Sequence, residues 1–79
     1  TSIKLPINIK INTKYEKKIS YLEKILEEKD LIYNFNIIKF DKDFIYYRII
    51  FNSTPNNFLK LMESHSLNFD TQKNVWILK

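Results

Sequence analysis

The chain has 79 residues, enough for one small domain but not for a second hydrophobic core. Hydrophobic residues make up 44% of it, which argues against disorder, while the absence of Cys and Gly excludes disulfides, thiolate chemistry and Gly-rich phosphate loops. The formal net charge is +4, but twelve of the thirteen cations are Lys in a composition rich in Ile and Asn, as an A/T-biased genome produces. The charge alone therefore predicts no nucleic-acid partner.

Residues 3–11 alternate between hydrophobic and polar positions, which predicts a half-buried strand. Ile3, Leu5, Ile7, Ile9 and Ile11 share one face, and the other carries Lys4, Pro6, Asn8 and Lys10. Because proline has no N–H to donate, we expect Pro6 to face a local bulge or the end of the strand.

Thr13-Lys14-Tyr15-Glu16 has the pattern of a capping box, with Thr13 as the N-cap of a helix. Hydrophobic residues then recur at helical spacing, at Tyr15, Ile19, Leu22 and Leu26. This spacing predicts an amphipathic helix of about four turns that ends near Lys29–Asp30.

Two runs rich in aromatic and β-branched residues, 31–40 and 44–52, flank Asp41-Lys42-Asp43 and predict a β-hairpin. Without Gly, we expect its turn to use the tolerance of Asp for left-handed backbone. The second run has two hydrophobic faces: one carries Ile45, Tyr47, Ile49 and Phe51, and the other carries Phe44, Tyr46, Arg48 and Ile50.

Thr54-Pro55 predicts the start of a second helix, with Thr54 as N-cap and Pro55 at the first helical position, ending around Ser64–Ser66. Leu67–Phe69 is a short extended piece, and Val75–Leu78 is the final strand. The order of elements predicts an α+β, ferredoxin-like βαββαβ sandwich, a four-stranded antiparallel sheet with both helices on one face.

In this topology the first and third strands are central, and Leu67–Phe69 forms an extra hairpin with the final strand. We expect residues 1–79 to be a single domain of a longer chain, because the sequence starts at Thr1 and not at Met.

Few side chains suit catalysis or metal binding. His65 is the only His, and beside Ser64 and Ser66 at a helix end it is more typical of a helix-dipole partner than of a general base. Asp41 and Asp43 flank a turn and offer fewer oxygens than a calcium loop needs. We therefore expect no catalytic residue, no bound metal and no cofactor.

The sheet face predicted to be free of helices carries the residues that favour an interaction. Tyr, Phe, Trp and Arg are enriched at protein interfaces, and a hydrophobic sheet face is usually covered. We expect a non-catalytic module that contacts a second copy, as in a homodimer, or the rest of its own chain. The candidate interface residues are Phe44, Tyr46, Arg48, Ile50 and Trp76.

A second hypothesis is binding of single-stranded nucleic acid on the same face, as in the RNA recognition motif. Bases would stack on Phe44 and Tyr46, aided by Arg48, Lys4 and Lys10. A third is a regulatory domain that binds a small ligand. No hydrophobic run reaches the length of a membrane helix, so we expect no membrane insertion.

From Leu22 to Leu78 the spacing resembles a small C-terminal module of poorly characterised proteobacterial envelope proteins. The matching elements are Leu22-x-x-Ile25, Tyr47–Phe51, Phe58-Leu59-x-x-Met62, His65-Ser66-Leu67-x-Phe69 and Trp76-Ile77-Leu78. The resemblance implies a bacterial accessory or interaction domain without catalytic residues, in which Trp76 and Leu78 are core or sheet-face anchors.

Overall fold

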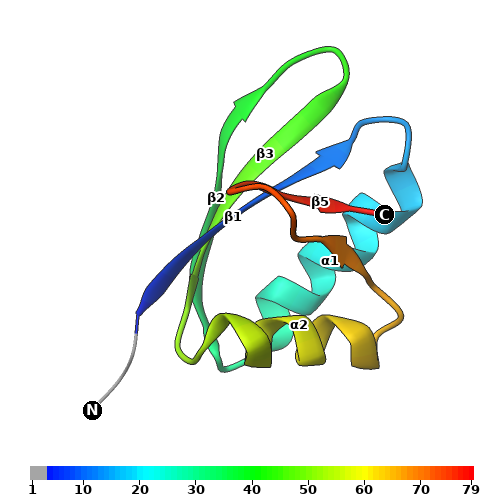
Figure 1. Ribbon diagram of the computed structural model, residues 1–79. Coiled ribbons are helices and arrows are strands. Elements are labelled where there is room, and N and C mark those ends of the chain that lie inside the picture. The colour runs from blue at the N-terminus through cyan, green and yellow to red at the C-terminus, as the bar shows by residue number, and fades with distance from the viewer. Residues whose placement is uncertain (1–3) are drawn as a thin grey trace.

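The computed structural model describes residues 4–79 as five strands and two helices. The elements in chain order are β1 (Leu5–Asn12), α1 (Glu16–Glu28), β2 (Ile32–Phe40), β3 (Phe44–Phe51), α2 (Pro55–Ser64), β4 (Phe69–Asp70) and β5 (Trp76–Leu78). The strands form one sheet in the order β2-β3-β1-β5-β4, and both helices cover the same face of it (Figure 1). Ile3, assigned to the first strand, lies outside the described residues.

The α+β class is confirmed, but the four-stranded antiparallel sheet is wrong, since the sheet is five-stranded and mixed. β4 and β5 pair antiparallel, as expected of the extra hairpin, and β5 then pairs parallel to β1 through Ile9↔Trp76 and Lys10↔Ile77. After α2 the chain first reaches the outer edge as β4 and then turns back as β5. This return inserts β5 between β4 and β1 and reverses the direction expected for the last strand.

β1 lies in the middle of the sheet and keeps the predicted alternation. Ile7, Ile9 and Ile11 are buried on the helix-covered face. Pro6 pairs with Ile50 of β3, and β5 reaches β1 only at residues 9 and 10. Pro6 therefore lies beyond the end of β5, where a missing N–H costs no ladder bond with that strand.

The capping box at Thr13 is wrong. α1 begins at Glu16 with Tyr15 as N-cap and no side-chain cap. The Thr13 hydroxyl instead donates to the Lys42 carbonyl at 3.0 Å, and the Thr13 N–H donates to the Asp43 carbonyl at 2.9 Å. The threonine thus ties the β1–α1 loop to the β2–β3 turn, a contact between segments about thirty residues apart.

α2 starts as predicted, because the Thr54 hydroxyl accepts the Asn57 N–H at 3.3 Å and Pro55 occupies the first turn. At its end Leu67 N–H donates to the Met62 carbonyl and Ser66 N–H to the Glu63 carbonyl, the bond pattern of a Schellman motif. Ser66 takes the left-handed position, with φ of 63°, that glycine usually fills.

The β2–β3 turn does not use left-handed backbone, contrary to expectation. Within the described residues only Ser66 has positive φ. The Asp41 carboxylate accepts the N–H groups of Asp43 at 2.9 Å and Phe44 at 2.8 Å, and Asp41 N–H donates to the Phe44 carbonyl at 2.9 Å. The side chain therefore closes the turn through hydrogen bonds, with ordinary backbone conformations.

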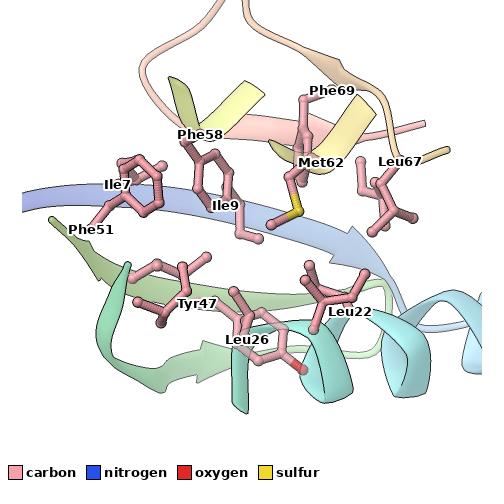
Figure 2. Close-up of a cluster of buried hydrophobic side chains, with 14 of the residues drawn as sticks. Ile7, Ile9, Leu22, Leu26, Tyr47, Phe51, Phe58, Met62, Leu67 and Phe69 are labelled. Carbon is pink, nitrogen blue, oxygen red and sulfur yellow. The ribbon is translucent and has the colours of Figure 1, made fainter. Parts of the chain in front are cut away.

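The core lies between the helices and the sheet, with Leu22 and Leu26 from α1 and Phe58 and Met62 from α2 (Figure 2). Phe58 is fully buried and contacts aromatic rings from separate strands, at centroid distances of 5.3 Å to Phe51, 5.9 Å to Phe69 and 6.3 Å to Trp76. One helical residue thus connects β3 to β4 and β5 on the other side of β1.

Candidate interaction surfaces

The sheet face opposite the helices is called here the outer face. Strand register places four of the five candidate interface residues on it, Phe44, Tyr46, Arg48 and Ile50, since each pairs with an outward position of β1. Three of them are half-buried and Arg48 is exposed. The predicted division of this strand into two faces is confirmed.

Trp76, the fifth candidate, does not lie with them. It pairs with buried Ile9, so its side chain is on the helix-covered face, where it packs against Phe58. Its indole is half-buried at the margin of the core. Ile77, its neighbour in β5, takes the outward position opposite Lys10.

Lysine side chains lie against the aromatic rings of the outer face. Lys10 Nζ is 4.6 Å from the ring centroid of Phe44 and 5.8 Å from that of Tyr46. Lys39 Nζ lies 5.1 Å from the ring centroid of Tyr46, and Lys4 Nζ lies 4.1 Å from the ring centroid of Tyr33. These distances are within the range of cation–π attraction, so the three rings lie beneath positive charges.

Backbone N–H groups and the lysines of this face lower the pKa of a carboxyl group at the nearby β2–β3 turn. Backbone N–H groups of Phe44 and Asp43 hold the pKa of the Asp41 carboxyl below its usual value, and the charges of Lys39 and Lys10 lower this pKa further. Both lysines belong to the outer face, so the turn carboxylate stays ionised beside them.

Strand β2 forms a free edge of the sheet, and sequence reasoning missed how much of it is exposed. Its large hydrophobic side chains are open to solvent, with exposed fractions of 74% at Phe40, 61% at Tyr33, 51% at Ile37 and 49% at Ile38. The alternation of β2 assigns Ile37 and Phe40 to the helix-covered face, but only Ile32 of this strand is buried. The helices therefore leave the hairpin end of that face open.

His65 contacts a tyrosine side chain at the surface. His65 Nδ1 lies 3.4 Å from the Tyr21 hydroxyl, and the two rings meet edge-on at the surface. Among residues 4–79 no three His, Cys, Asp or Glu side chains come together as metal ligands. A surface hollow at the start of α1 is lined only by the consecutive residues 14–18.

Comparisons with known proteins found no matching family model, curated protein or solved structure. The resemblance to envelope-protein modules therefore stays a prediction. Over residues 4–79 no helix has the length and hydrophobicity to span a membrane.

Proposed function

We propose that this domain is a non-catalytic interaction module that self-associates through strand β2. The observation that carries the proposal is the free edge itself, nine residues long, with four large hydrophobic side chains about half exposed or more. An edge strand presents unpaired backbone N–H and C=O groups, so its natural partner is another extended strand. Hydrophobic side chains on such an edge favour pairing over exposure to water.

The features that keep edge strands apart are confined to the two ends of β2. β2 contains no proline, and its one charged residue is Lys39. Its pairing with β3 shifts register between Ile32 and Asn34 and again between Ile37 and Lys39. The four residues between these shifts are regular, so the centre of β2 offers an undistorted edge.

A second copy fits this edge antiparallel with the two-fold axis at Asn36. This register overlaps all nine residues of β2, and where both residues of a pair have a partner in β3, it places residues of the same face opposite each other. Phe35 faces Ile37 of the second copy on the helix-covered side, and Ile32 faces Phe40. Registers shifted by one residue would place hydrophobic positions opposite outward asparagines.

The charges also suit this register. Lys39 lies opposite Tyr33 of the second copy, both on the outer face, where a cation can contact a ring as Lys39 already contacts Tyr46. No lysine of β2 faces another lysine. The proposed dimer therefore has no like-charge pair along the new strand contact.

Light scattering of the 79-residue chain over a wide concentration range tests the proposal. We expect the mass to rise from one chain to two, and Asn36→Lys to keep it at one chain, because the axis would place two like charges face to face. Asn34→Lys is the matched control, since it adds the same charge to the same face but lies opposite Ile38. Equal masses for the two variants, or a wild-type chain that stays single at high concentration, would refute the proposal.

A further inference from the structure

We infer that the outer face binds single-stranded nucleic acid, through phosphate contacts from its cations and base stacking on its rings. The site is formed by β1, β2 and β3 and comprises Lys4, Lys10, Lys39, Arg48, Tyr33, Phe44 and Tyr46. Two of these residues, Tyr33 and Lys39, belong to β2, but the site uses their side chains on the outer face and not the backbone edge, so this inference does not require self-association.

The first argument is the placement of charge. Genome composition explains how many lysines the chain has, and most of the twelve lie elsewhere, so the argument concerns which charged residues occupy this face. Lys4, Lys10, Lys39 and Arg48 all lie on the outer face, whereas Asp70, at the far edge, is the one acid on an outward strand position of the described residues. Four glutamates lie on α1, and Asp41 at the β2–β3 turn is the acid beside Lys10 and Lys39. The face is thus complementary to a polyanion.

The second argument is the position of the rings. Phe44 and Tyr46 are neighbours on the outer face of β3, with ring centroids 6.4 Å apart. Tyr33 lies near the start of β2, with Lys4 Nζ 4.1 Å from its ring centroid. Each ring has a lysine ammonium within 6 Å. A phosphate that draws a lysine aside would uncover the ring for the adjoining base. A charged surface without rings would bind nucleic acid no better than other polyanions of equal charge.

The third argument is that the outward amides and the open sheet surface suit unpaired bases. Asn8, Asn34 and Asn36 lie among the cations on outward positions, and their amides can both donate to and accept from base edges. The Asn8 amide is already oriented, since its Oδ1 lies 3.5 Å from Arg48 Nε. An open sheet surface suits unpaired bases laid flat on it, whereas a duplex keeps its bases stacked inside.

Fluorescence anisotropy with a labelled twelve-nucleotide oligothymidylate tests the inference at low salt. The comparison probes are an abasic oligomer of equal charge, the matched duplex and polyglutamate. We expect the oligothymidylate to bind at least tenfold more tightly than the abasic strand, because stacking one base typically contributes this much. With four phosphate contacts, the logarithm of affinity falls with the logarithm of salt at a slope of about 3.

Two variants separate the charge from the rings. Lys10→Gln is expected to weaken binding and lower the salt slope by about 0.7, and Tyr46→Leu to weaken binding about tenfold with the slope unchanged. Lys24→Gln, which removes one charge from an exposed position of α1, is expected to change neither.

Other outcomes would overturn the inference. Absence of oligothymidylate binding at low salt excludes the site. Equal binding of the abasic strand or the duplex shows attraction to any polyanion, without base recognition. Tighter binding of polyglutamate indicates an acidic protein segment as the ligand. An equal loss in Lys24→Gln and Lys10→Gln places the contact elsewhere on the molecule.

Discussion

Tyr47 shows how one residue of β3 connects the two layers. Its ring is fully buried, and its hydroxyl donates a 2.7 Å hydrogen bond to Glu23 Oε1 on α1. Burial raises the pKa of this hydroxyl, and the hydrogen bond and negative charge of Glu23 raise it further. The folded protein therefore keeps Tyr47 neutral at a pH where the unfolded chain ionises it.

This shift predicts a loss of stability in alkali. A raised folded-state pKa gives stability that is complete below the unfolded value near 10 and declines as the pH rises above it. We expect the free energy of unfolding to fall by up to about 1.4 kcal/mol per pH unit above pH 10. Urea titrations from pH 8 to pH 11 measure this decline.

Tyr47→Phe removes both effects. At neutral pH we expect it to cost about 1 kcal/mol, the usual contribution of one hydrogen bond, and to abolish most of the alkaline decline. Tyr15→Phe, on an exposed ring, is the control and should leave the decline unchanged. A decline that persists undiminished in Tyr47→Phe would show that another group causes it.

At the scale of single elements, the C-terminus of α2 ends with a left-handed residue, and a serine takes this position because the chain has no glycine. Ser66 has φ of 63°, where a Cβ is disfavoured. The position is required because Leu67, whose N–H closes the motif on Met62, is buried in the core. The helix must therefore end with a left-handed residue to return the chain to the sheet.

Replacing this serine should stabilise the domain. We expect Ser66→Gly to raise the free energy of unfolding by up to about 1 kcal/mol, because glycine takes left-handed backbone without steric cost. Ser64→Gly, two residues earlier within α2, should instead lower it by about 0.5 kcal/mol through helix propensity. Thermal denaturation of the two variants checks the opposite signs, and a lower Tm for Ser66→Gly would contradict the account.

Local pattern was sufficient to predict most elements but not the tertiary contacts. Period-two alternation correctly assigned both faces of β1 and β3, and Thr54-Pro55 correctly marked the start of α2. Thr13 has the same capping chemistry, yet its hydroxyl bonds to the β2–β3 turn, a contact that depends on a distant segment.

The last strand shows the same limit for topology and for the candidate site. All four residues of Val75-Trp76-Ile77-Leu78 are hydrophobic, so no alternation could tell which side Trp76 faces. Its parallel direction follows from the β4–β5 hairpin and not from any local signal. The exposure of β2 depends on how far the two helices cover the sheet. The sequence of β2 alone does not show this.

At the scale of the whole molecule, the fold depends on α2 to hold β3, β4 and β5 together. Phe58 contacts aromatic residues from all three strands. A domain of this size has a free energy of unfolding of about 4–12 kcal/mol. A single cavity at this point can remove much of it.

We expect Phe58→Leu to cost about 1–2 kcal/mol and Phe58→Ala about 3–5 kcal/mol. Chemical denaturation measures both. Phe40→Ala is the control at a concentration where the chain is unpaired, because it removes the same ring from a side chain that is 74% exposed and should change stability by less than about 0.5 kcal/mol. Similar losses at the two positions would contradict the assignment of the core.

The assembled molecule, two copies joined at β2, is the central claim, and a charge exchange at the two-fold axis tests it most directly. Asn36→Lys and Asn36→Asp should each remain single chains when alone, because each would place like charges face to face. Light scattering of their equimolar mixture should give twice the mass of one chain, since opposite charges then meet at the axis. A mixture that stays at the mass of one chain, while the wild type pairs, would contradict this register.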